Sequence, residues 1–231
     1  MSDDPLKSRN PAKLQAAKRE LLSLLLEKER IESHGSKRVE PRLNRNNTPL
    51  SFGQERLWFL DQLDPGNSVY NICRAQRLKG PLDTAALERS LHEIVRHHEI
   101  LRTIFPAVDG RPVQIVKPIL TLRLPLFDLQ QVISTSREAE TTRIINEEAR
   151  YAFNLSSGPL FRVALLRLAR EEYVLVITAH QIVCDGWSMG LLFQGIERAY
   201  ETITNGQPVL LRELSVQYGD YAEWQRNWLQ G

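Results

Sequence analysis

The sequence has few cysteines and no long hydrophobic run. Cys73 and Cys184 are the only two cysteines among 231 residues, and they do not form a C-x-x-C pair. This excludes a disulfide framework and a cysteine-based zinc site, and it fits a reducing compartment. No apolar run approaches the roughly 18 residues that a membrane span needs, and the N-terminus, MSDDPLKSRN, lacks the features of a signal peptide. We therefore expect a cytoplasmic protein that does not enter a membrane.

The sequence also has no large excess of positive or negative charge. The 30 Lys and Arg residues nearly balance the 28 Asp and Glu residues, for a formal net charge of +2. This balance gives no reason to expect nucleic acid as a partner. The sequence has no glycine-rich phosphate loop, and the adjacent His97 and His98 point about 100° apart on a helix, which does not suit a shared metal. We expect neither a metal nor a cofactor of the protein's own.

What the sequence does contain is a main body preceded by a short appendage. Residues 11–32, PAKLQAAKRELLSLLLEKERIE, have leucines at three- and four-residue steps and predict an amphipathic helix. Its apolar stripe either packs on the main body or docks another chain. Residues 33–48 are polar and without periodicity, as in a linker. We therefore divide the chain into 1–48, helix and linker, and 49–231, the main body.

Helices and strands alternate along the main body. The patterns predict helices over 51–63, 83–103, 134–153, 188–206 and 215–231, with Ser51 and Ser188 as possible caps. They predict strands over 69–80, 103–108, 111–118, 120–129 and two within 161–180, with hairpin turns at Asp109-Gly110 and near Arg170-Glu171. The expected fold class is α/β, or α+β with a mixed sheet and packed helices.

Candidate chemistry gathers where the apolar run EEYVLVIT ends, in AHQIVCDGWSMG, residues 179–190. Active sites favour such strand-to-helix corners, and His180 and Asp185 can both lie near the mouth of this loop. Gly186 permits a positive φ or a close approach of the backbone to a ligand. A buried aspartate is costly unless it is paired, and Arg102, in HHEILRTIF, is the best candidate partner.

Two side chains of this loop have alternative interpretations. Cys184 follows His180 by four residues, but no third group is evident that could orient a nucleophile and base, so a small buried thiol is the preferred interpretation. His180 is either a core histidine with a satisfied hydrogen bond or a direct participant in the site.

Three stretches, in order along the chain, resemble the motifs of one family. SFGQERLWFL (51–60) resembles S-x-A-Q-x-R-L-W-x-L, and HHEILRTIF (97–105) resembles R-H-E-x-L-R-T-x-F. AHQIVCDGWS (179–188) resembles the signature M-H-H-x-x-x-D-G-x-S. On these motifs the chain from Pro49 onward resembles the N-terminal half of a condensation domain of nonribosomal peptide synthetases, in the chloramphenicol acetyltransferase-like superfamily.

The resemblance implies an architecture and a reaction. Two lobes form a V, and the active site lies in a tunnel between them, with the signature loop at its floor. Peptidyl and acyl carrier proteins bring thioesters to the tunnel mouths on phosphopantetheine arms, and an acceptor amine attacks the donor thioester to form an amide. The sequence ends about where the first lobe ends in the family. We therefore expect the donor-side lobe, with the C-terminal lobe and adjacent synthetase domains as partners and possible docking through helix 11–32.

The resemblance also assigns roles to single residues. Gln181 occupies the position of the family's second histidine, the candidate base, and an amide side chain cannot take a proton near pH 7. If that role is general base, its loss should cost roughly 10²–10⁴-fold; if it is orientation of the amine, Gln181 can partly substitute. His180, Asp185 and Gly186 match the rest of the signature, and the Asp185–Arg102 pair would hold the loop.

Three further motif positions, Ser51, Arg56 and His98, are expected to support the structure. The sequence thus leaves two hypotheses. In the first, the chain is the donor-side lobe of an amide-forming domain, inactive until a second lobe completes the tunnel. In the second, it is a non-catalytic module that docks a carrier protein or synthetase. An acetyltransferase-type oligomer with its site between protomers is a third, less favoured alternative.

Overall fold

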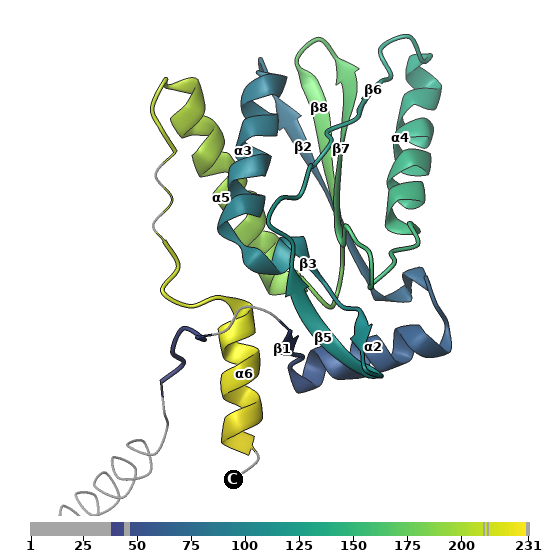
Figure 1. Cartoon of the computed structure of the whole chain (residues 1–231). Coiled ribbons are helices and arrows are strands. Elements are labelled where there is room, and N and C mark those ends of the chain that lie inside the picture. Colours follow the sequence, from purple (N-terminus) through teal and green to yellow (C-terminus); the bar gives the residue numbers. More distant parts are fainter. Residues whose placement is uncertain (1–37, 44–46, 210, 212, 230–231) are drawn as a thin grey trace, which may run out of the picture. The chain divides into compact units, whose positions relative to one another are not determined.

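The computed structural model describes residues 38–43, 47–209, 211 and 213–229 (Figure 1). The helix expected over 11–32 lies outside the described residues. Glu40–Gly231 forms one compact unit. This unit takes in residues that were predicted to belong to the linker, because Arg42 and Thr48 are both buried.

A mixed four-stranded sheet forms the centre of the unit. Its order is β2 (Asn71–Lys79), β8 (Glu172–His180), β7 (Phe161–Ala169) and β6 (Leu126–Asp128). Strands β2 and β7 both run antiparallel to β8, whereas β6 runs parallel to β7. The β7–β8 pair confirms the two strands predicted within 161–180. Strand β8 is therefore central, and its carboxyl end carries His180.

Helices cover both faces of this sheet, so that it lies in the middle of three layers (Figure 1). Helices α3 (Thr84–His97) and α5 (Gly186–Thr204) cover one face, and α4 (Ser134–Ala149) covers the other. Alternate strand residues divide between the two sides: Val163, Leu165, Leu175 and Ile177 pack in the larger core, and Ala164, Leu166, Val174 and Val176 pack in the smaller. Burial on both faces explains why these strands read as continuous apolar runs, and it confirms the α/β class.

A smaller antiparallel sheet lies beside the main one. Strand β5 (Arg111–Val116) pairs with β1 (Thr48–Pro49), β3 (Thr103–Ile104) and β4 (Ala107–Val108). The β4–β5 hairpin turns at Asp109 and Gly110, whose φ angles of 51° and 74° fit the left-handed turn that Asp-Gly favours. This turn was predicted correctly. Helix α2 (Phe52–Leu63) follows β1. Helix α6 (Tyr218–Leu229) packs against β1.

Helix α3 ends earlier than the apolar pattern predicted. It stops at His97, and the predicted last turn is instead a 3₁₀ helix, η2 (Glu99–Arg102), leading into β3. The Gln217 side chain holds this break, because its Nε2 donates to the His97 carbonyl (3.0 Å) and its Oε1 accepts from the Glu99 N–H (3.1 Å). A residue 120 positions away thus satisfies the backbone groups that a continuing helix would have paired.

Helix α4 and the strand expected over 120–129 are also shorter than predicted. Helix α4 ends at Ala149 because Asn71 donates its side-chain N–H groups to the carbonyls of Ala149 (2.9 Å) and Tyr151 (2.7 Å). In the second segment only β6 is a strand. Pro125 precedes it, and proline cannot donate a ladder hydrogen bond. Helix α5, in contrast, begins two residues earlier than expected.

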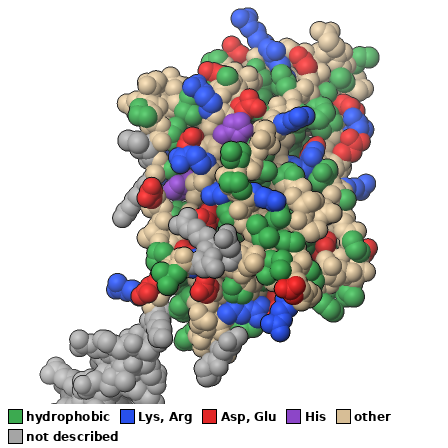
Figure 2. Space-filling view, in the orientation of Figure 1, with side chains coloured by type: hydrophobic (Ala, Val, Ile, Leu, Met, Phe, Trp, Pro, Cys, Tyr) green, Lys and Arg blue, Asp and Glu red, His purple; other side chains and the backbone are tan. Residues whose placement is uncertain are grey.

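Side chains of both signs are interspersed over the face shown in Figure 2. Within the described part of the chain, no helix is both long and apolar enough to cross a membrane.

Candidate functional site

The strand-to-helix loop, residues 180–186, joins the central strand β8 to helix α5. The chain leaves the sheet in a tight turn, in which the Val183 N–H donates to the His180 carbonyl (3.0 Å). Asp185 then caps α5 by accepting from the Ser188 N–H (2.7 Å), so the cap is Asp185 and not Ser188. The loop thus lies where the sequence predicted it, at the carboxyl end of a buried strand.

His180 is buried within this loop, with 2% of its surface exposed. Its Nδ1 accepts the Ile182 N–H (3.1 Å), which assigns the ring proton to Nε2 in the neutral form. Burial lowers the pKa of His180 to about 4. The side chain therefore shapes the turn and is a poor proton acceptor near neutral pH, which favours the core-histidine alternative.

The low pKa of His180 predicts acid destabilisation. The unfolded chain binds this proton near pH 6.5 and the folded chain only near pH 4, so the free energy of unfolding should fall as the pH drops through that window. The loss should reach about 3 kcal/mol. In His180→Asn, where Oδ1 can replace Nδ1 as acceptor, urea denaturation should show a correspondingly weaker fall between these pH values. An unchanged fall would contradict the assignment.

Gln181 lies on the outside of the same turn. Its backbone N–H donates to the carbonyl of Tyr70 (2.8 Å), which ends the 3₁₀ helix η1 (Ser68–Tyr70) just before β2, while its side chain is exposed. The adjoining segments carry exposed apolar side chains: Trp187 is 80% exposed and Leu191 54%, one turn apart on α5, and Val69, next to Tyr70 in sequence, is 68% exposed. The loop therefore exposes the side chain of residue 181 and buries that of residue 180.

The predicted ion pair between Arg102 and Asp185 is wrong. Arg102 Nη1 donates to the Lys117 carbonyl (2.6 Å), and the exposed Asp185 carboxylate serves as the helix cap. Hydrogen bonding by Ser188 lowers the pKa of the Asp185 carboxyl. A capping carboxylate at a helix N-terminus is stabilised by the backbone N–H groups and the helix dipole, so it needs no arginine.

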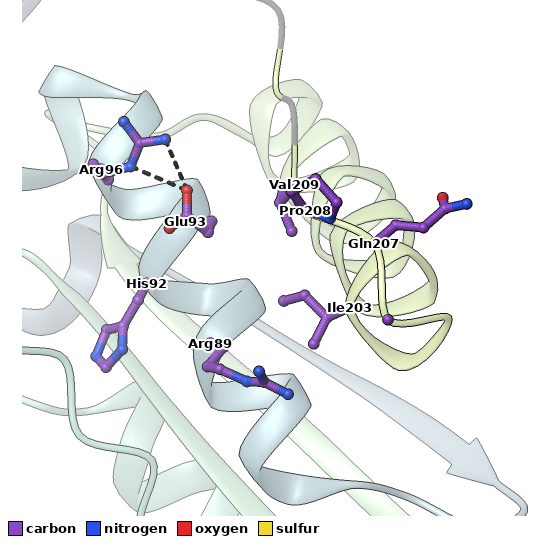
Figure 3. Close-up of a pocket in the computed structure, with 9 residues that line it drawn as sticks. Arg89, His92, Glu93, Arg96, Ile203, Gln207, Pro208 and Val209 are labelled. Atoms are coloured by element: carbon purple, nitrogen blue, oxygen red, sulfur yellow. Dashed lines mark hydrogen bonds and ion pairs between the residues drawn. The ribbon is translucent and has the colours of Figure 1, made fainter.

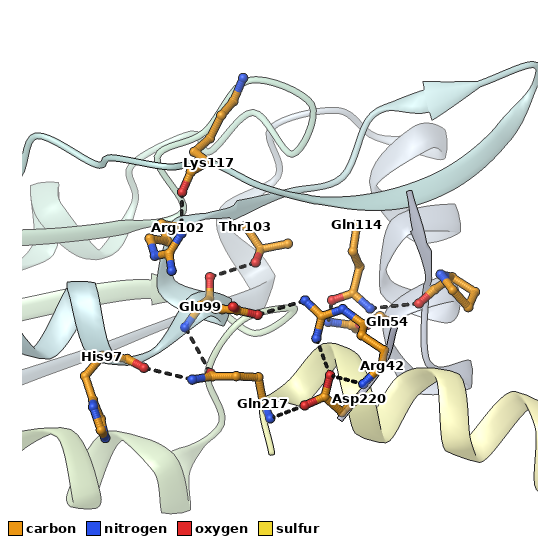
Figure 4. A network of polar contacts seen from close by, with 11 residues as sticks. Arg42, Gln54, His97, Glu99, Arg102, Thr103, Gln114, Lys117, Gln217 and Asp220 are labelled. Carbon is orange, nitrogen blue, oxygen red and sulfur yellow. Dashed lines mark hydrogen bonds and ion pairs between the residues drawn. The ribbon is translucent and has the colours of Figure 1, made fainter. Parts of the chain in front are cut away.

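A buried arginine does hold the lobe together, but it is Arg42 (Figure 4). Its Nη2 lies 2.8 Å from Glu99 Oε2, and its Nη1 lies 2.5 Å from Asp220 Oδ1. All three side chains are buried. The network ties the segment before β1 to η2 and α6. Arg42 escaped prediction because it lies in a polar stretch that shows no periodicity.

Of the three motif positions expected to support the structure, Ser51 and His98 lie in packed surroundings and Arg56 does not. Ser51 caps α2 in a reciprocal capping box with Gln54, and its hydroxyl lies 3.1 Å from the Tyr218 hydroxyl. Arg56 is exposed on α2. His98 is half-buried at the end of α3, and burial together with the neighbouring His97 lowers its pKa to about 4.

Gly186 has no positive φ, and Cys184 is a buried thiol, as the sequence led us to prefer. Gly186 is the first residue of α5 and its φ is not positive, so the backbone itself does not demand glycine there. A Cβ would meet nothing within 4 Å, which leaves space beside the loop. Burial and the nearby Asp185 raise the pKa of the Cys184 thiol to about 12, so it stays protonated and is a poor nucleophile.

A pocket of about 800 Å³ lies away from the loop (Figure 3). Arg89, Glu93 and Arg96 of α3 line one side, and Ile203 with residues 207–209 line the other. Arg96 is paired with Glu93 at 2.8 Å. None of the lining residues belongs to the strand-to-helix loop. The described residues also contain no group of three or more His, Cys, Asp or Glu side chains that could hold a metal ion.

The model of the condensation domain family matches residues 44–231. The chain belongs to the condensation domain family. This agrees with the three motifs in the sequence. The first and the third are in contact in the structure, because Gln54 of α2 donates a hydrogen bond to the Ile182 carbonyl in the strand-to-helix loop.

Curated condensation-domain relatives are parts of very long synthetases. Phosphinothricin tripeptide synthetase PhsC of Streptomyces viridochromogenes is 43% identical over 181 residues, which is 78% of this chain and 17% of that protein. Chondramide synthase cmdD of Chondromyces crocatus is 42% identical over 177 residues, 77% of this chain and 4% of that protein. The chain therefore corresponds to a small section of these relatives.

Solved condensation-domain structures share the fold. The X-domain from teicoplanin biosynthesis, solved in complex with OxyB, aligns with a TM-score of 0.75 and 29% identity over 84% of this chain and 41% of that one. The starter condensation domain of rhizomide synthetase RzmA aligns with a TM-score of 0.73 and 23% identity. The alignment covers 80% of this chain and 44% of that one. The chain thus matches less than half of each neighbour.

Proposed function

We propose that residues 49–231 act as the donor-side lobe of an amide-forming condensation domain. Its substrates would be acyl or aminoacyl thioesters on the phosphopantetheine arms of peptidyl or acyl carrier proteins in the cytoplasm. The observation that carries this proposal is the loop geometry: the signature of the family lies on a turn that buries residue 180 and exposes residue 181. Residue 181 is then the loop side chain that can reach a bound thioester and amine.

The side chain at this position limits the chemistry. Gln181 can accept a hydrogen bond from the incoming amine and so orient it, but it cannot remove the proton that the amine must lose. His180 does not replace it, because it is buried and its pKa lies near 4. Asp185 is committed to capping α5. We therefore expect slow amide formation, in which the protein orients the amine, the C–S bond of the thioester breaks, and the amine proton passes to the departing phosphopantetheine thiolate.

A second lobe would complete the site. The exposed Trp187 and Leu191 form an apolar strip on the first turns of α5, directly beside the loop. Apolar surface of this kind is typical of a protein interface. We assign this strip to contact with the C-terminal lobe, which would supply the opposite wall of the tunnel and exclude water from residue 181.

The alternative function is that of a docking module without catalysis. Two observations favour it: Gln181 in place of a proton-accepting side chain, and the likeness to the X-domain that was solved in complex with OxyB. In this role the lobe would bind a carrier protein or an adjacent synthetase domain. Docking through the sequence at 11–32 belongs to this alternative as well.

Reconstitution separates the two functions. The chain is mixed with a separately produced C-terminal lobe of a related condensation domain and with carrier proteins loaded with donor and acceptor, and the amide is measured by mass spectrometry. The enzymatic proposal predicts product with the Gln181→His variant and slower product with the native chain. Binding of loaded carrier proteins without product from either form would contradict it and support the docking module.

A further inference from the structure

One polar side chain lies buried directly beneath the strand-to-helix loop. Gln54, on the first turn of α2, is 2% exposed. Its Nε2 donates to the Ile182 carbonyl at 3.3 Å and to Gln114 Oε1 at 3.4 Å, and its Oε1 accepts from the Ser51 N–H at 3.1 Å. The side chain therefore connects the start of α2, strand β5 and the loop. Figure 4 shows Gln54 beside Gln114 of β5.

The partners fix which end of the Gln54 amide faces the loop. The Ser51 N–H can only donate, so it requires the oxygen, and the Ile182 carbonyl can only accept, so it requires the nitrogen. Gln114 is held in the same way, because its Nε2 donates to the Pro49 carbonyl (2.8 Å) and its Oε1 faces Gln54. The orientation of both amides follows from the backbone groups around them.

The Gln54 contact completes a set of hydrogen bonds around Gln181. The Gln181 N–H is held by Tyr70, the Ile182 N–H by His180 Nδ1, and the Ile182 carbonyl by Gln54. The backbone on both sides of residue 181 is thus fixed while its side chain is exposed. Of these contacts, the one from Gln54 comes from a side chain of α2, and it holds the loop in the way that was predicted of Arg102.

We propose that Gln54 is the positioning residue that sets the direction of the side chain at 181. This rests on the proposed function, in which residue 181 faces the thioester and amine. Gln54 does not contact the reacting groups; it acts through the Ile182 carbonyl. Loss of this bond leaves a buried carbonyl without its donor, so the turn should relax and residue 181 should lose its fixed direction.

The variant Gln54→Glu separates this role from helix capping. Glutamate suits the third position of a capping box as well as glutamine does, so one oxygen still accepts from Ser51. The other oxygen now faces the Ile182 carbonyl and repels it. The matched control is Gln114→Glu, also a 2% exposed glutamine, which keeps an acceptor for Gln54 and loses only the bond to Pro49.

Amide hydrogen exchange, followed by NMR on the full chain, tests the proposal without any assay of activity. At about pH 8, Gln54→Glu should lower the protection of the Gln181, Ile182 and Val183 amides about five- to tenfold, as expected for one lost hydrogen bond, with β7 and β8 unchanged. Gln114→Glu should leave these three amides within about twofold. At about pH 5, protonation gives the introduced carboxyl group an O–H donor, and protection corrected for intrinsic exchange should recover.

Two outcomes would overturn the proposal: unchanged protection at 181–183 in Gln54→Glu, or an equal fall in Gln114→Glu. If Gln54→Glu does not fold, Gln54→Met, which has similar length but neither charge nor donor, must show the same local loss. In the reconstituted assay with a Gln181→His background, Gln54→Met should lower kcat and leave KM unchanged. If the hydrogen-exchange changes occur as predicted but no form gives product, the proposed function is contradicted and the positioning role of Gln54 stands.

Discussion

Replacing Arg42 with methionine is expected to lower the free energy of unfolding by about 3–5 kcal/mol, because removing one member of a buried ion network leaves uncompensated charge. Glu99 and Asp220 are each 5% exposed, and both face the Arg42 guanidinium. The methionine fills the volume of the arginine stem but carries no positive charge. Urea denaturation at neutral pH, followed by circular dichroism, measures the change.

The matched control for this variant is Arg77→Met. Arg77 also contacts two carboxylates, Glu138 at 2.8 Å and Glu172 at 2.9 Å, but its side chain is 41% exposed. Ion pairs in contact with water contribute at most about 1 kcal/mol. Similar small losses in both variants would show that the Arg42 network does not hold the segment before β1, η2 and α6 together.

Replacing Gln181 with histidine is expected to raise the rate of amide formation about 10²–10⁴-fold, the usual contribution of a positioned general base. The imidazole would stand at an exposed position, where it can take the proton that the attacking amine releases. The measurement is the initial rate with loaded carrier proteins and the separately produced C-terminal lobe, compared with the native chain.

Gln181→Asn is the control, because asparagine offers the same amide group and no base. Its rate should not exceed that of the native chain. Equal rates for the histidine and native forms would show that residue 181 orients the amine and takes no proton, and the slow step would then lie elsewhere.

Local patterns in the sequence were sufficient for most of the fold. The continuous apolar runs of β7 and β8 and the Asp109-Gly110 turn depend on side chains that are close in sequence, and all were predicted correctly. The helix ends were less accurate, since distant side chains determine them: Gln217 stops α3, and Asn71 stops α4. No local pattern carries that information.

The site shows the same limit. The motif identified the loop and its residues, but the partner of each charge depends on which groups are buried. The rule that a buried carboxylate needs an arginine was sound, and it applies to Glu99 and Asp220 with Arg42. It failed for Asp185 because that side chain is exposed at a helix N-terminus. Gln54 belongs to the first motif, but its hydrogen bond to the Ile182 carbonyl is evident only from the structure.

The most direct test concerns which of two adjacent positions can handle a proton. In the Gln181→His variant, NMR titration of the imidazole protons reports the pKa of the introduced imidazole and that of His180 separately. The introduced imidazole, being exposed, should titrate near the ordinary value of about 6.5, while His180 should stay neutral down to about pH 4. If the introduced imidazole stays neutral below about pH 5, or if His180 titrates near 6.5, the loop does not bury one residue and present the other.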